Sequence, residues 1–169
     1  FQVERMYEGA LPSADPQVTV AFWREIEALN GRTSAARVVL REAMERVELL
    51  QKALIRTAAA PGQLETDLDV LEEALADLDE QLSGTRAKQG IGEKQDEPTL
   101  GTRQSFAWTS SRSTYGPTAS QRRSLEIAAE EFSGIRAELA RLVETEMPRI
   151  ERAMQAAGAP WIEGQKLPD

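Results

Sequence analysis

Residues 22–54 read FWREIEALNGRTSAARVVLREAMERVELLQKAL, and this stretch decides the fold class. Apolar or small residues recur in it at alternating steps of four and three: Phe22, Ile26, Leu29, Thr33, Ala36, Leu40, Ala43, Val47, Leu50, Leu54. Because an α-helix has about 3.6 residues per turn, this spacing draws one stripe along a single helix. We expect that helix over about 16–58, with a length of roughly 60 Å at 1.5 Å per residue. A helix this long needs packing partners along its whole length.

The same spacing recurs twice more. It appears first in Leu64, Leu68, Leu71, Leu75, Leu78, Leu82 and then in Leu125, Ala128, Phe132, Ile135, Leu139, Leu142. These stripes predict helices over about 62–83 and 118–157. The first two helices should form an antiparallel hairpin, since a very short connection places consecutive helices side by side. We therefore predict an all-α fold, an elongated antiparallel three-helix bundle with two helices of about 40 residues and one of about 20.

Local signals mark where the first and third helices begin and where they are interrupted. Asp15-Pro16 is a strong helix start, and Asn30-Gly31 is a weak point at which the stripe nevertheless keeps its phase. Thr118 with Gln121 fits a capping box for the third helix. Within that helix Pro148 coincides with a phase change from Leu142 to a stripe of Val143, Met147, Ile150, Met154 and Ala157, as expected for a bend.

The two ends of the chain fall outside the predicted helices. Residues 1–14 form an extended segment, which is either the last strand of a preceding β domain or a disordered terminus. The chain opens on Phe1 rather than Met, so we expect a processed product or a piece of a longer polypeptide. The helical bundle should span residues 15–165, and the tail, residues 158–169, should fold back over one end of it.

The loop over residues 84–117 lacks sustained periodicity and has two interpretations. In the first, Leu100, Phe106 and Trp108 belong to a short helix or hairpin that packs onto the bundle where the second helix falls short. In the second, the loop is a binding loop that presents its exposed side chains to a partner: Arg103, Trp108, Arg112, Tyr115.

Composition excludes most catalytic chemistry. The chain has no histidine and no cysteine, which removes the usual general base, the thiolate nucleophile and nearly all zinc or haem sites. Paired carboxylates lie on charged helix faces and not in a cleft, and no phosphate loop or nucleophile elbow occurs. We expect no enzyme, and no catalytic, cofactor or metal residues.

The net charge of −8 is concentrated in the first half of the chain. Residues 1–84 carry 8 Lys and Arg against 16 Asp and Glu, whereas residues 85–169 carry 12 of each sign. Eight acids and no basic residue lie between Gly62 and Leu82, which argues against binding nucleic acid or anionic lipid. The acidic face is either simply solvated or a docking strip for a basic partner or for the arginines of the third helix. Every apolar stripe is broken by charges, so we expect no membrane-spanning segment.

Several segments in order resemble a known family: the stretch from Leu82-Ser83-Gly84 through Gln95-Asp96-Glu97-Pro98-Thr99, then residues 115–123, 126–132, 147–151 and 157–161. Together they resemble the C-terminal helical region of bacterial secreted proteins built on a sortilin-like β-propeller with BNR (Asp-box) repeats, where a small β-sandwich precedes the helices. The resemblance covers roughly residues 16–165 and departs at Asp96, where asparagine is usual. It implies a secreted, periplasmic or cell-envelope location and a neighbouring propeller or sandwich domain, and it carries no functional residue onto this chain.

Our leading hypothesis is a non-catalytic spacer or docking module for a propeller or larger assembly. An accessory ligand-binding module that recognises an anionic group through its arginines is one alternative, and a self-associating coiled coil completed by a second copy is another. Trp23 either widens the core face or packs against a neighbouring domain, and Arg122 and Arg123 should pair with acids of the second helix or of the loop. The candidate partner-contact residues are Trp23, Arg103, Phe106, Trp108, Arg112, Tyr115, Arg122, Arg123 and Trp161.

Overall fold

The computed structural model describes residues 12–58, 62–85, 88, 90–93, 97–113 and 115–165. Over these residues the protein is all-α and contains no strand, so the predicted fold class is confirmed. The strand expected at residues 1–3 lies outside the described residues.

Helix α1 (Pro16–Ile55) is continuous over 40 residues. Asp15 caps its first turn by accepting a hydrogen bond from the Gln17 backbone N–H at 2.8 Å. The helix passes through Gly31 without a break, because the apolar stripe keeps one phase on both sides and holds the helix against its neighbours. It ends three residues before the expected Ala58, where the chain turns toward helix α2 (Gly62–Ser83).

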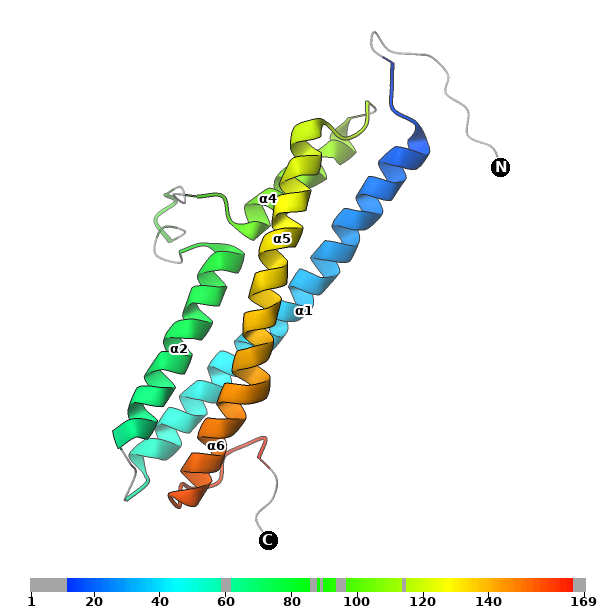
Figure 1. Ribbon diagram of the computed structural model, residues 1–169. Helices are drawn as coiled ribbons and strands as arrows, with labels where there is room; N and C mark the ends of the chain where they lie inside the picture. Colours follow the sequence, from blue (N-terminus) through cyan, green and yellow to red (C-terminus); the bar gives the residue numbers. More distant parts are fainter. Residues whose placement is uncertain are drawn as a thin grey trace.

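The arrangement differs from the expected three helices, because a further helix fills the predicted loop. Helix α2 runs beside the C-terminal half of α1 (Figure 1). Helix α4 (Leu100–Trp108) and the 3₁₀ turn η1 (Thr109–Arg112) follow it, and α4 packs on both α1 and α5 (Ala119–Arg141). Helix α4 therefore covers the part of α1 that α2 is too short to reach, as the first interpretation of the loop required.

Of the three side chains that the sequence suggested would pack α4 onto the bundle, Leu100 does so and the two aromatic ones do not. Leu100, Gln104 and Ala107 are buried against the bundle, whereas Phe106 and Trp108 are 47% and 43% exposed. The expectation that both aromatic side chains pack onto the bundle is therefore wrong, because the nine-residue helix turns only the face with spacing 100, 104 and 107 inward.

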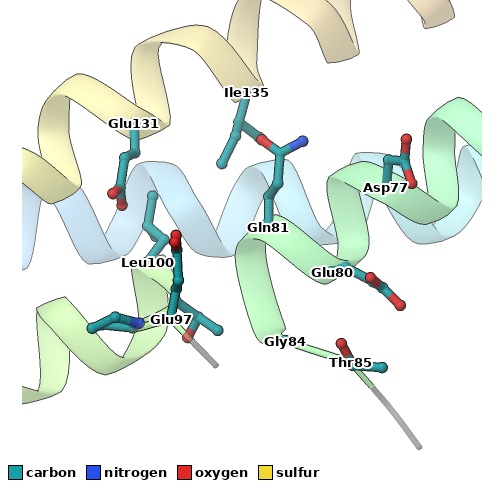
Figure 2. A pocket seen from close by; sticks show the side chains of 11 residues that line it. Asp77, Glu80, Gln81, Gly84, Thr85, Glu97, Leu100, Glu131 and Ile135 are labelled. Atoms are coloured by element: carbon teal, nitrogen blue, oxygen red, sulfur yellow. The ribbon is translucent and has the colours of Figure 1, made fainter. Parts of the chain in front are cut away.

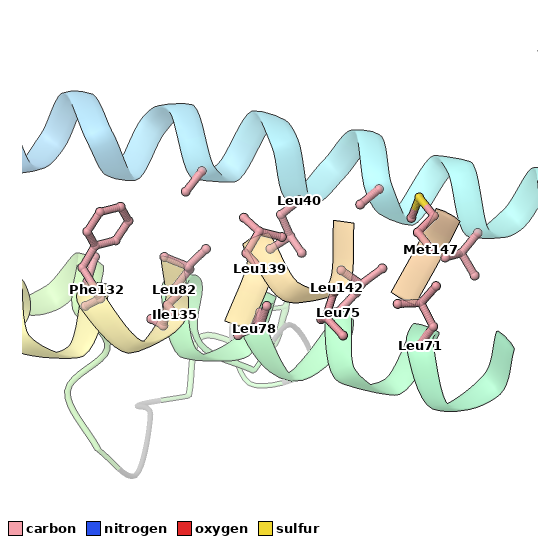
Figure 3. Close-up of a cluster of buried hydrophobic side chains, with 14 of the residues drawn as sticks. Leu40, Leu71, Leu75, Leu78, Leu82, Phe132, Ile135, Leu139, Leu142 and Met147 are labelled. Carbon is pink, nitrogen blue, oxygen red and sulfur yellow. The ribbon is translucent and has the colours of Figure 1, made fainter. Parts of the chain in front are cut away.

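The three predicted stripes form the core. All the stripe positions of α2 and of residues 125–142 are buried, and so are those of α1 apart from Leu54, whose place Ala53 takes. Figure 3 shows Leu40 of α1 facing leucines of α2 and the run from Phe132 to Met147. One polar residue, Thr33, lies in the α1 stripe, and it is satisfied because its hydroxyl accepts from Gln104 Nε2 of α4 at 3.0 Å and donates to the Leu29 carbonyl.

A π-helical turn, η2 (Leu142–Glu146), interrupts the expected third helix and separates α5 from α6 (Met147–Ala156). The Met147 N–H donates to the Leu142 carbonyl, five residues earlier, so the turn holds one more residue than an α-helical turn would. This extra residue accounts for the phase change from Leu142 to Met147, which the sequence had suggested came from a bend at Pro148.

The C-terminal segment turns back onto the bundle after α6. Ile162 packs against the core, and Arg46 of α1 donates to the Glu163 carbonyl while its Nε lies 2.7 Å from a carboxylate oxygen of Glu151. These contacts close the end of the molecule at which α1 meets α2 (Figure 1).

Candidate functional site

The surface around α4 carries the exposed aromatic side chains of the predicted loop. Phe106 and Trp108 project from α4, and Tyr115, 44% exposed, follows η1. The Tyr115 carbonyl accepts from the Ala14 N–H at 3.3 Å, which ties this segment to the chain entering α1. Gly116 adopts φ +82°, a conformation that glycine accepts readily, and it lets the chain turn back toward α5.

A groove of about 670 Å³ runs between α4 and α5, and we call it the Phe106 groove. Its lining is largely apolar and contains three of the predicted contact residues, Arg103, Phe106 and Arg123. The lining residues are Pro98, Thr102, Arg103, Phe106, Ala119, Ser120, Arg123, Ser124 and Ile127.

The two arginines of the Phe106 groove are already paired within the chain. Arg103 Nε donates to both carboxylate oxygens of Glu131, at 3.0 and 3.2 Å, and so fastens α4 to α5. Arg123 lies 3.1 Å from Glu126 and 3.8 Å from Glu130, both on its own helix. The expected pairing of Arg123 with acids of the second helix or the loop is wrong, because nearer acids lie one and two turns along α5.

Arg122 also differs from expectation. Its guanidinium carbon lies 5.3 Å from the centre of the Phe22 ring on α1, a distance at which a cation is attracted to the face of an aromatic ring. Arg122 therefore helps to cover the core between α1 and α5, instead of reaching the acids of α2.

A second groove, of about 850 Å³, lies on the other side of α4, and we call it the Arg37 groove. It brings together two predicted contact residues, Trp108 and Arg112, with Arg37 of α1, which was not among the predicted contact residues. Its lining residues are Asn30, Arg37, Leu82, Ser83, Thr99, Gly101, Thr102, Gln104, Ser105, Trp108, Thr109 and Arg112.

The remaining candidates lie apart from the two grooves. Trp23 is partly buried against the core, and its enclosed indole Nε1 meets no acceptor among the described residues, so Trp23 widens the core face. Trp161 is exposed and belongs to the segment after α6, and α6 ends at the opposite end of the molecule from α4 (Figure 1). The nine candidates thus do not form one site: five line the α4 grooves, Tyr115 lies near them, and the other three lie elsewhere.

One sequence signal could have located this surface. Residues 98–125 contain four arginines and no Asp, Glu or Lys, in a chain whose net charge is −8. Among the described residues, neither groove has a carboxylate in its lining, and this segment supplies most of the lining of both. The segment and the acidic α2 give the molecule two surfaces of opposite sign.

An acidic hollow of about 460 Å³ lies between α2, α4 and α5. Asp77 and Glu80 of α2 contribute to it, together with Glu97 and Glu131, but the carboxyl groups lie apart and do not converge on one point (Figure 2). Among the described residues, no group of three or more acidic side chains is placed to hold a metal ion.

The acidic face of α2 makes one well-defined contact with α6. The Gln63 amide and the Arg149 guanidinium each donate to Asp67 at 2.8 Å, and these two hydrogen bonds hold the pKa of the Asp67 carboxyl below its ordinary value. Arg149 belongs to the segment that the sequence predicted as the third helix. At Asp67 the acidic face of α2 therefore binds an arginine of that segment, which is one of the roles predicted for this face. On α5 the Arg141 guanidinium similarly lowers the pKa of Glu138.

Comparison with known proteins adds no relative. No family model, no curated protein and no solved structure matches this chain. The resemblance to sortilin-like BNR-repeat proteins therefore stays a prediction. In the part of the chain that the structure describes, none of the helices combines the length and the apolar character needed to cross a bilayer.

Proposed function

We propose that this chain is a non-catalytic interaction module, a helical spacer that docks a partner protein or a neighbouring domain through the surface around α4. The observation that supports the proposal most directly is the gathering of exposed aromatic side chains, Phe106, Trp108 and Tyr115, within a segment rich in arginine and free of acids. Aromatic residues and arginine are the residue types most enriched at protein interfaces and at their energetic centres.

The rest of the molecule suits a spacer. Helix α1 is continuous over 40 residues, which corresponds to about 60 Å at 1.5 Å per residue. Its apolar stripe is covered by helices of the same chain, so a second copy is not needed to complete it. This coverage favours the docking hypothesis over the self-associating coiled coil.

The expected setting rests on the family resemblance alone. We propose that the module belongs to a secreted or envelope-associated bacterial protein and that its partner is a propeller or sandwich domain or another subunit. Because the acidic helix α2 lies beside the α4 segment, an approaching partner would meet surfaces of both signs, which is an arrangement that sets orientation as well as contact.

The test compares capture by matched variants of the full chain. Tagged wild-type protein, a Phe106→Ala/Trp108→Ala variant and an Ile55→Ala/Val70→Ala variant are incubated with extract and medium from the source organism, and bound proteins are quantified by mass spectrometry. Ile55 and Val70 are exposed apolar residues outside the α4 surface, so the third protein controls for nonspecific apolar binding.

We expect one protein that binds the wild type and the Ile55/Val70 variant equally and binds the Phe106/Trp108 variant at least about tenfold less, since an interface centre loses about 2 kcal/mol or more on truncation. Circular dichroism of all three proteins checks that the helices are intact. Equal capture by all three folded proteins, or equal loss from both variants, would overturn the assignment of the α4 surface.

A further inference from the structure

The Arg37 groove differs from the rest of the surface in its charge. Twelve of the residues that the structure describes line it and none of these is acidic, although the chain as a whole has 28 Asp and Glu against 20 Lys and Arg. Its two charged residues are Arg37 and Arg112, which approach from different elements, α1 and the end of η1. The groove therefore presents positive charge from two sides.

Neither arginine has a carboxylate partner in the part of the chain that the structure describes. Arg37 Nη2 donates to the Leu82 carbonyl at 3.0 Å, while its Nε is enclosed and meets no acceptor. A guanidinium taken partly out of water without a counter-charge keeps an uncompensated loss of hydration. An anion in the groove would offset that loss.

Capping of α2 uses only part of the hydrogen-bonding capacity and charge of the Arg37 side chain. A cation is favoured at the C-terminal end of a helix, and the bond to Leu82 lies one residue before the end of α2. That bond uses one of the five N–H groups of the side chain, so the remaining donors and most of the charge are left over. Arg112 has no such capping bond and is exposed on the groove's rim.

The close approach of α4 to Arg37 depends on a glycine. A Cβ atom built on Gly101 would lie 3.3 Å from Arg37 Nη2, which is tighter than most Cβ contacts in proteins. It would also lie 3.5 Å from the Leu82 carbonyl oxygen, an ordinary van der Waals distance. The first turn of α4 can therefore lie against the guanidinium, and the groove opens beside it. The hydroxyls of Thr102 and Ser105 line the same side.

Trp108 supplies an apolar surface beside this charge. It is 43% exposed and lines the groove two turns along α4 from Gly101. The face of an indole ring stacks well on other flat rings and contributes dispersion contact without consuming hydrogen bonds. A groove with two cationic donors and one exposed indole suits a ligand with an anionic group attached to a flat ring.

We propose that the Arg37 groove binds a small molecule that carries a carboxylate or phosphate on a flat ring. The oxyanion accepts hydrogen bonds from Arg37 and Arg112, and the ring packs on Trp108. This site is separate from the Phe106 groove, whose arginines are neutralised by Glu131, Glu126 and Glu130.

Phenyl phosphate is the probe that tests the proposal, with inorganic phosphate and phenol as probes that each carry one of its two features. Titrations of the full chain are followed by calorimetry and by the NMR signals of arginine Nε–H and tryptophan indole N–H groups. Benzoate, titrated in parallel, distinguishes carboxylate from phosphate preference.

We expect phenyl phosphate to shift the Arg37, Arg112 and Trp108 signals and to bind at about millimolar affinity, more tightly than either single-feature probe. Arg112→Gln should weaken binding about tenfold or more, since a charge-assisted hydrogen bond is lost. Arg141→Gln, which removes an exposed arginine on α5, should leave it unchanged. Arg112 makes no ion pair within the described residues, so its replacement leaves the fold intact, whereas Arg37→Lys also tests the cap of α2.

Four results would overturn the proposal. One is the absence of binding up to about 10 mM phenyl phosphate. Another is equal binding by the wild type and Arg112→Gln. A third is signal shifts confined to arginines outside the groove. The fourth is inorganic phosphate binding as tightly as phenyl phosphate, which would remove Trp108 from the site. Trp108 also belongs to the proposed docking surface, but these titrations contain no partner protein, so each proposal can fail without the other.

Discussion

We expect the protein to stay folded when Thr145 is deleted. Deleting a residue from the middle of a helix that packs on a core normally unfolds a protein. Thr145 is exposed and lies within the π-helical turn Leu142–Glu146, where the buried residues on either side, Leu142 and Met147, are five positions apart. Removing one residue reduces this step to four, which is a normal α-helical step. Everything beyond the turn then keeps its present face.

The matched control is deletion of Ser133, an exposed residue of α5. There the helix is a regular α-helix, so losing one residue rotates all later positions by about 100°. Six buried residues would leave the core: Ile135, Leu139, Leu142, Met147, Ile150 and Met154. At about 1.5–3 kcal/mol each, the loss is roughly 9–18 kcal/mol, comparable with or above the whole stability of a domain, which is about 5–15 kcal/mol.

Pro148 limits what the Thr145 deletion alone can show. In an α-helix its ring would clash with the carbonyl four residues earlier, at a cost of about 3 kcal/mol or more. We therefore expect the Thr145 deletion to unfold about 3 kcal/mol more easily than the wild type. In a Pro148→Ala background, the same deletion should change stability by only about 1 kcal/mol, because the clash is gone.

Urea denaturation followed by circular dichroism measures all of these proteins. We expect a cooperative transition for the Thr145 deletion in both backgrounds and none for the Ser133 deletion. If the Thr145 deletion in the Pro148→Ala background were as disordered as the Ser133 deletion, the π-turn would not be the source of the phase change.

Three further variants test the backbone conformation of two glycines and the ion pair of Asp67. Gly31→Ala should stabilise the protein by about 0.5–1 kcal/mol, because an added Cβ inside α1 meets nothing within 4 Å. Gly116→Ala should destabilise it by more than about 1 kcal/mol, because φ there is +82° and the Cβ would lie 2.5 Å from that of Ala14; thermal unfolding of both variants gives the comparison. The pKa of Asp67 is lowered from 3.8, so its interaction contributes stability above that pH and loses it as the pH falls through the folded-state pKa. Asp67→Asn should therefore lower the free energy of unfolding by about 0.2–1 kcal/mol at pH 7, since Arg149 is half exposed. In strong acid the variant and the wild type should be equally stable. The same stability difference in urea denaturation at pH 7 and in strong acid would contradict this.

The helices of this protein could be predicted because each one repeats a single local signal many times. The leucines of α2 all prove buried, and the capping box of Thr118 and Gln121 forms at the start of α5 as expected. Each such signal needs only the geometry of one helix. Over ten or more residues the periodicity outweighs a single weak residue, which is why Gly31 does not break α1.

The α4 surface was harder to predict because its character depends on which side of a short helix faces inward. Phe106 and Trp108 look like core residues by type, and only the packing of Leu100, Gln104 and Ala107 leaves them outside. In nine residues the apolar pattern is too brief to define a face. Tertiary contacts therefore decided which aromatic side chains remain available to a partner.

The sequence by itself determined the fold class, the helix starts and the three buried stripes, since these follow from spacing along one chain. Only the tertiary structure decided which arginines pair with acids. Arg103 pairs with Glu131 and Arg122 lies over the Phe22 ring, whereas Arg37 and Arg112 line one groove without a carboxylate partner among the described residues. The physical reason is that charge pairing depends on distance in space. Arg37 and Arg112 come together only because α4 folds across α1 where α2 ends.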